Sequence, residues 1–176
     1  MIFCEIELKG AYIIDMEKFH DERGFFARSW CQNEFQSHGL NSNLVQCNVS
    51  FNAKKGTLRG MHYQIAPFEE AKLVRCTRGS IYDVIIDLRR KSSTYKQHFG
   101  ITLNSCEHTM LYVPEGFAHG FLTLEDDTEI FYQMAEFYSP ECARGVRWDD
   151  PAFGIEWPIE VRVISDRDTN YPDSNM

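Results

Sequence analysis

The sequence lacks most features of secreted and membrane proteins. Its six cysteines, at positions 4, 31, 47, 76, 106 and 142, include no C-x-x-C pair and no closely spaced pair, so we expect free thiols in a reducing compartment. No apolar run approaches the ~20 residues that a membrane helix needs. Residues 1–9 contain Glu5, Glu7 and Lys9, unlike the apolar segment of a signal peptide. The sequence therefore predicts a cytoplasmic protein with no membrane partner.

Positive charge is also scarce. The 176 residues include 18 Lys plus Arg against 26 Asp plus Glu, which gives a formal net charge of -8. Because nucleic-acid binding requires a basic face, this balance argues against a nucleic-acid partner. Any anionic ligand has to be met by a local cluster of Arg and Lys. No linker rich in Pro, Gly, Ser or charge divides the chain, so we expect a single domain over residues 1–176.

Alternating apolar residues predict β-structure almost throughout. In residues 81–88, Tyr82, Val84, Ile86 and Leu88 fall on one face of a strand. A strand over 73–76 precedes it across a Gly-containing turn, which predicts a hairpin. Aromatic residues make up 14% of the chain and suit half-buried strands. Further strands are expected at 5–14, 25–30, 99–103, 109–113, 120–124, 128–134 and 162–165.

Helix signals are few. Asn33 is a candidate cap for a short helix that runs to His38, with Gly39 just past its end. Strands at this spacing, with so little helix between them, predict an all-β sandwich or barrel.

Residues 56–64, Gly-Thr-Leu-Arg-Gly-Met-His-Tyr-Gln, form the first segment with chemical potential. Strict alternation places His62 on one face of a strand and Arg59 on the other. A lone histidine is more often a satisfied core residue than a functional one. An arginine in an apolar strand, however, needs an anion nearby, and this favours a binding site.

Residues 114–119, Pro-Glu-Gly-Phe-Ala-His, match P-x-G-x-x-H, the second half of the cupin motif. This resemblance implies a cupin-type double-stranded β-helix, or jelly-roll barrel, with a few short helices. A metal-binding cupin also needs an H-x-H pair in the first half, whereas His62 here precedes Tyr63 and Gln64. Because His62 and His119 alone are too few ligands for a tight divalent site, we predict a barrel without metal.

Basic residues are concentrated in residues 72–78, which hold Lys72, Arg75 and Arg78. Taken alone, they describe a solvated face of a strand and turn. Together with Arg23 and Arg59 they form a candidate cradle for a diphosphate.

Ordered matches along nearly the whole chain resemble the nucleotide-sugar 3,5-epimerases typified by dTDP-4-dehydrorhamnose 3,5-epimerase. The matching segments are 21–26, 46–50, 56–64, 72–75, 114–121, 138–140, 144–151 and 165–168. The resemblance implies an isomerase that inverts carbons 3 and 5 of dTDP-4-keto-6-deoxyglucose to give dTDP-4-keto-L-rhamnose, a precursor of cell-surface polysaccharide. Such a reaction needs a base on one face of the sugar, an acid on the other and a cation near the enolate oxygen. The resemblance implies no redox cofactor and no metal.

The resemblance also assigns catalytic roles. His62 is the expected base, and Asp168 orients its imidazole. Tyr132 is the expected acid on the opposite face, and Lys72 stabilises the enolate oxygen. The structural alternatives are an ordinary strand aromatic for Tyr132 and a tail carboxylate for Asp168.

Binding roles follow in the same way. The substrate-binding set consists of Arg23 and Arg59 for the diphosphate, Gln46, Asn48 and His119 for further polar contacts, and Phe26 and Tyr138 beside the sugar or base. Family members are homodimers whose N-terminal strands cross to the partner, and the strand-like residues 5–14 permit this.

The chain departs from the family pattern at several positions. Arg28 stands where an acidic residue is common, Asn52 where Ser is usual, Glu70 lies in a segment where Gln is common, and Met134 in one where Lys is more frequent. These changes leave other substrates open. The alternatives are an epimerase that inverts one centre of a GDP- or CDP-linked sugar, a ketoisomerase of the same fold, a non-catalytic nucleotide-sugar-binding cupin and a metal-dependent cupin oxygenase.

Overall fold

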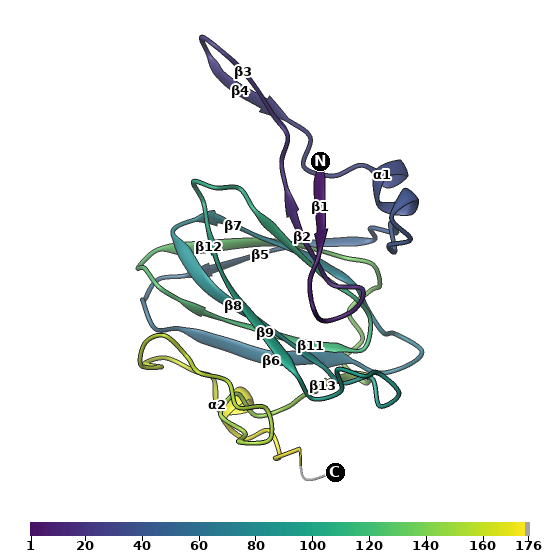
Figure 1. Ribbon diagram of the computed structural model, residues 1–176. Coiled ribbons are helices and arrows are strands. Elements are labelled where there is room, and N and C mark those ends of the chain that lie inside the picture. Colours follow the sequence, from purple (N-terminus) through teal and green to yellow (C-terminus); the bar gives the residue numbers. More distant parts are fainter. Residues whose placement is uncertain (175–176) are drawn as a thin grey trace.

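The computed structural model describes residues 1–174, and two antiparallel sheets stack face to face as a jelly-roll barrel (Figure 1). The six-stranded sheet contains, in spatial order, β1 (Ile2–Glu5), β2 (Tyr12–Asp15), β10 (Met110–Val113), β7 (Lys72–Arg78), β12 (Thr128–Met134) and β5 (Gln46–Asn52). The five-stranded sheet contains β13 (Ala143–Gly145), β6 (Leu58–Gln64), β11 (Phe117–Thr123), β8 (Ser80–Asp87) and β9 (His98–Asn104). The predicted all-β cupin class is confirmed.

Four short elements lie outside the barrel. Strands β3 (Lys18–Asp21) and β4 (Gly24–Ala27) pair into an arm that projects from the barrel (Figure 1). Helix α1 (Gln32–Ser37) lies on the same side as this arm, and α2 (Asp166–Thr169) lies beside the five-stranded sheet (Figure 1). In residues 1–174, no helix is long and apolar enough to span a membrane.

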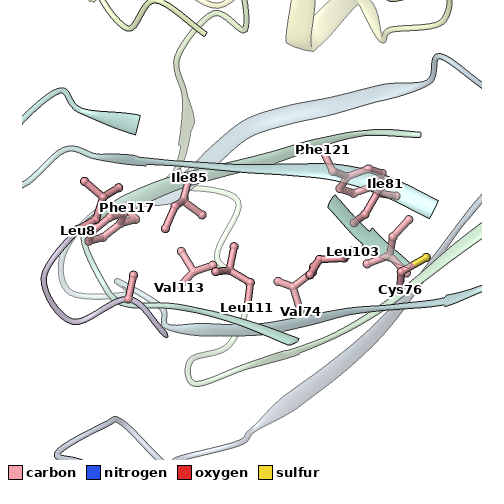
Figure 2. Close-up of a cluster of buried hydrophobic side chains, with 12 residues drawn as sticks. Leu8, Val74, Cys76, Ile81, Ile85, Leu103, Leu111, Val113, Phe117 and Phe121 are labelled. Atoms are coloured by element: carbon pink, nitrogen blue, oxygen red, sulfur yellow. The ribbon is translucent and has the colours of Figure 1, made fainter. Parts of the chain in front are cut away.

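Apolar side chains from both sheets fill the barrel (Figure 2). Val74 of β7 and Leu111 of β10 meet Ile81 and Ile85 of β8, and all four are fully buried. Burial of each such side chain contributes roughly 1.5–3 kcal/mol relative to exposure. This core holds the two sheets at a fixed separation.

The outer face of the five-stranded sheet is also covered. Val84 and Ile86 of β8 pack there with Val146 and Phe153 from the C-terminal segment. Strand β8 is therefore buried on both faces, which explains why both of its alternating sets of positions carry apolar side chains. The same contacts hold the C-terminal segment against the sheet that carries β6.

The predicted hairpin between residues 73–76 and 81–88 is wrong. Strand β7 pairs with β10 and β12, whereas β8 pairs with β11 and β9 in the other sheet. Gly79 connects them at a φ of +76°, and a Cβ there would lie 2.5 Å from Thr128 Oγ1. The glycine thus marks a crossover between sheets, where both a left-handed backbone and close packing exclude a side chain.

Several predicted boundaries also need correction. Residues 5–14 are not one strand, because β1 and β2 form a hairpin whose connection includes Gly10 at a φ of +89°. The strand expected over 25–30 ends at Ala27, and 162–165 contributes only a bridge between Val163 and Thr57. Helix α1 is capped at Cys31 rather than Asn33, without a side-chain hydrogen bond.

Candidate active site

A cavity of about 640 Å³ lies between the two sheets. Strands β5, β7 and β12 of the six-stranded sheet form one wall, and β6, β11 and β13 form the other. Eight of the predicted site residues line it, namely Gln46, Asn48, Arg59, His62, Lys72, His119, Tyr132 and Tyr138. Residues far apart in the sequence therefore converge on one chamber.

A bulge in β6 places Arg59 and His62 on the same cavity wall. In the pairing of β11 with β6, His119 lies opposite His62 and Phe121 lies opposite Arg59. The two β11 residues are two positions apart in the sequence, whereas the two β6 residues are three positions apart. The extra residue in β6 reverses the alternation, so the prediction that Arg59 and His62 occupy opposite faces is wrong. Gly60 lies in this bulge at a φ of +140°, and a Cβ there would lie 2.5 Å from the Cα of Gly120.

His62 and Asp168 form a hydrogen-bonded pair. His62 Nε2 lies 2.7 Å from Asp168 Oδ1, and the Gly60 N–H donates to Oδ2 at 3.2 Å. The Ser165 hydroxyl caps α2 by accepting from the Asp168 N–H at 3.1 Å, which fixes the carboxylate at the helix start. Burial alone raises the pKa of Asp168, but its hydrogen bonds outweigh this effect and hold the pKa below the ordinary value of 3.8.

The ionised carboxylate determines the tautomer of His62. Because it accepts a hydrogen bond from Nε2–H, the lone pair of the neutral ring lies on Nδ1. The His62 side chain is 39% exposed, whereas that of Asp168 is 5% exposed. The imidazole can thus take a proton from a bound molecule while Asp168 stabilises the resulting charge.

Tyr132 and Lys72 lie on the facing wall, on β12 and β7. Burial raises the pKa of Tyr132 above 10.0, with a further increase from the Glu70 carboxylate and an opposing effect of Arg59. The Lys72 ammonium donates to Glu70 Oε1 at 2.9 Å and lies 3.4 Å from the His62 carbonyl oxygen. This wall therefore presents a protonated phenol and an ammonium group across from the imidazole.

The remaining polar side chains are held by their neighbours. Arg59 Nε donates to Asn52 Oδ1 at 2.7 Å, and His119 Nε2 lies 3.0 Å from the buried Asp83 carboxylate. Gln46 Oε1 accepts from the backbone N–H of Tyr138 at 3.2 Å. These contacts orient the Arg59 guanidinium, the His119 imidazole and the Gln46 amide before any ligand arrives.

Two lining cations were missed in the sequence analysis. Arg144 and Arg167 join Arg59 and Lys72 on the cavity wall, and no carboxylate of residues 1–174 lines it. Both arginines lie in segments that match the family, 144–151 and 165–168, so the signal was present. The local cluster opposes the acidic character of the whole chain and suits an anion.

Other predicted cradle residues lie elsewhere. Arg75 points away from the cavity, on the face of β7 opposite to Lys72, with its guanidinium 5.1 Å from the Phe131 ring. Arg78 lies 3.9 Å from Asp127 in an exposed pair. The cradle drawn from residues 72–78 is therefore wrong for these two arginines. Alternation sends Arg75 to the face opposite Lys72, and Arg78 lies at the far end of β7, away from the cavity.

Arg23 and Phe26 lie on the β3–β4 arm and do not line the cavity of their own chain. The Arg23 side chain is 85% exposed and pairs with Asp21, and Phe26 is 76% exposed. Their binding roles remain predictions.

The two cavity histidines are cross-strand partners on β6 and β11. Each uses Nε2 on a carboxylate, His62 on Asp168 and His119 on Asp83. Among the described residues, no group of three or more His, Cys, Asp or Glu side chains is arranged to hold a metal ion.

Comparison with known proteins agrees with this geometry. The family model described as dTDP-4-dehydrorhamnose 3,5-epimerase matches residues 5–175. The enzyme of that name from Sinorhizobium fredii is 42% identical over 98% of this chain and 89% of its own length. The structure of the Bacillus anthracis epimerase with TDP and PPi bound has a TM-score of 0.93 at 40% identity and covers 98% of both chains.

A third relative carries a sugar nucleotide. It is the dTDP-6-deoxy-D-glucose-3,5-epimerase of Legionella pneumophila in complex with dTDP-4-keto-L-rhamnose, with a TM-score of 0.89 at 32% identity, covering 97% of this chain and 90% of that chain. Matches of this extent confirm the resemblance read from the sequence. The chain belongs to the dTDP-4-dehydrorhamnose 3,5-epimerase family.

Proposed function

We propose that the protein inverts carbons 3 and 5 of dTDP-4-keto-6-deoxyglucose and so forms dTDP-4-keto-L-rhamnose. One observation carries the proposal: His62 on β6 and Tyr132 on β12 line the same cavity from opposing sheets. A sugar ring between them has a base toward one face and an acid toward the other. Inversion requires this arrangement, whereas binding alone does not.

Each inversion proceeds through two proton transfers. The C–H bonds beside the C4 carbonyl are acidic, and His62 Nδ1 removes the proton while the electron pair moves to the carbonyl oxygen. The Lys72 ammonium stabilises the resulting enolate oxygen. Tyr132 then delivers its proton to the opposite face of the carbon, and solvent returns a proton to the phenolate as His62 releases its own.

The cationic wall suits the diphosphate. Arg59 and Arg167 supply planar guanidinium groups that match phosphate oxygens. Gln46, Asn48 and His119 provide the further polar contacts, and the half-exposed ring of Tyr138 flanks the nucleotide base. The TDP and sugar-nucleotide complexes of the relatives support this assignment.

We also propose that the protein is a homodimer and that it acts in the cytoplasm. The β3–β4 arm exposes Phe19, Phe25 and Phe26, while Val49 and Phe51 are exposed on the edge strand β5 beside the cavity. Exposed aromatics on a projecting arm favour contact with a second copy, whose cavity would receive Arg23 and Phe26. Light scattering should give twice the chain mass of 20.5 kDa, and a monomer mass would contradict the dimer.

Solvent deuterium tests the reaction. The protein is incubated with dTDP-4-keto-6-deoxyglucose in deuterated water, and carbons 3 and 5 are followed by NMR. We expect deuterium at both carbons, because each inversion replaces a carbon-bound proton with one from solvent. Deuterium at one carbon would indicate the single-centre reaction. No exchange with this substrate or with GDP- and CDP-linked analogues would overturn the proposed function.

A further inference from the structure

One buried carboxylate lies behind the cavity wall, in contact with the lining residue Lys72, and has no role in the proposed reaction. Glu70 lies two residues before Lys72 in the connection from β6 to β7, and it is 7% exposed. Its Oε1 lies 2.9 Å from Lys72 Nζ. Its Oε2 is buried and has no hydrogen-bond partner among the described residues.

Such a carboxylate is costly for the fold. Burial of an ionised group requires compensating partners, and here only one oxygen has one. Because Oε2 accepts no hydrogen bond, its negative charge is not dispersed by a donor and acts on the ionisable groups around it.

The groups around this carboxylate are those that must carry protons. Lys72 is in direct contact, and Tyr132 on the adjacent strand β12 lies close enough for Glu70 to contribute to its raised pKa. On the facing sheet, Arg59 opposes this effect on Tyr132. His62 and His119 lie across the cavity, and each is paired with its own carboxylate.

We propose that Glu70 is a positioning residue that holds the Lys72 ammonium in place and keeps the acid side of the site protonated, and thereby sets the alkaline limit of activity. The inference rests on the proposed function of Lys72 and Tyr132. A nearby negative charge favours the protonated form of the Tyr132 phenol. Its removal lets Tyr132 lose its proton at lower pH, which deprives the carbon of its acid. It also leaves the Lys72 ammonium without the carboxylate that holds it in place.

Glu70→Gln tests the proposal, because glutamine keeps the shape of the side chain and removes its charge. The alkaline limb of the kcat/KM profile should move down by about one pH unit, the scale on which one neighbouring charge moves a pKa. Glu69→Gln is the matched control, since Glu69 is exposed and next in the sequence. This control should leave the limb in place.

A second variant separates charge from packing. Glu70→Asp retains the negative charge on a shorter side chain and should keep the alkaline limb close to that of the wild-type protein. If Glu70→Gln leaves the limb unmoved, or if Gln and Asp shift it equally, the proposal is overturned.

A measurement without substrate distinguishes this proposal from the function itself. The phenolate absorbance of the protein minus that of its Tyr132→Phe variant reports the ionisation of Tyr132 alone. Repeating the pair of titrations in the Glu70→Gln background should lower the Tyr132 midpoint. An unchanged Tyr132 midpoint contradicts the role of Glu70, even if the protein is an epimerase. If the midpoint falls but the protein exchanges no substrate proton, only the proposed epimerase function is contradicted.

Discussion

Replacing His62 with asparagine is expected to lower kcat by about 10³-fold, within the range that general base catalysis contributes. Asparagine offers an N–H to the buried Asp168 carboxylate, which accepts from His62 at 2.7 Å, but it has no basic nitrogen. Proton removal from the sugar therefore becomes slow while the cavity keeps its cations. Initial rates and deuterium incorporation at carbons 3 and 5 measure the effect.

Binding separates loss of chemistry from loss of structure. The dissociation constant for dTDP, measured by calorimetry, should stay within a few-fold of that of the unmodified protein, because Arg59 and Arg167 are untouched. His38→Asn is the control, since His38 is exposed at the end of α1. If the His62→Asn variant still exchanges protons at the normal rate, the base has been misassigned.

Tyr132→Phe is expected to separate exchange from inversion. The variant retains His62, so protons are still removed and enolate still forms, but the opposite face lacks its acid. His62 then returns deuterons to the face from which it took protons. We expect deuterium incorporation with inversion reduced by about 10²-fold or more, the lower part of the range for a general acid.

The same NMR spectra measure both quantities, because loss of the H3 and H5 signals reports exchange, and the chemical shifts of the remaining ring and methyl signals distinguish the substrate from its inverted product. Tyr95→Phe, in the connection between β8 and β9, is the matched control and should change neither. Full inversion in the Tyr132→Phe variant would show that another group delivers the proton.

The sequence predicted the structure of individual strands better than the pairing between strands. The alternation of residues 81–88 correctly placed Ile81 and Ile85 on one face of β8 and Val84 and Ile86 on the other. The hairpin across Gly79 was wrong, because a glycine turn is compatible with both a hairpin and a crossover between sheets. Only the tertiary pairing of β7 with β12 distinguishes them.

The site shows the same division. Alternation separated Arg59 from His62, because strict alternation assumes a strand without a bulge. Gly60 was the available signal, since a glycine inside a strand often marks a bulge. His62 and Asp168 are 106 residues apart, so no local pattern could join them. Only the ordered resemblance to a family predicted that pair. In the structure, the Ser165 cap of α2 and the packing of Val146 and Phe153 against the sheet bring Asp168 to His62.

Charge was informative at one scale and misleading at another. The net charge of -8 excluded a basic nucleic-acid-binding face but did not describe the cavity, where Arg59, Lys72, Arg144 and Arg167 converge. The concentration of basic residues in 72–78 selected Arg75 and Arg78 instead, because closeness in the sequence does not specify which side chains line the same cavity.

The central claim is that base and acid act on opposite faces of the sugar ring. A crystal structure of this protein with dTDP-4-keto-L-rhamnose tests it most directly. The predicted result places the sugar ring between β6 and β12, with His62 Nδ1 and the Tyr132 hydroxyl on opposite faces of the ring. Each lies roughly 3–3.5 Å from a reacting carbon, 3 or 5, which is the separation of a near-attack geometry. A ring that has both side chains on one face, or that lies outside the cavity, would contradict the claim.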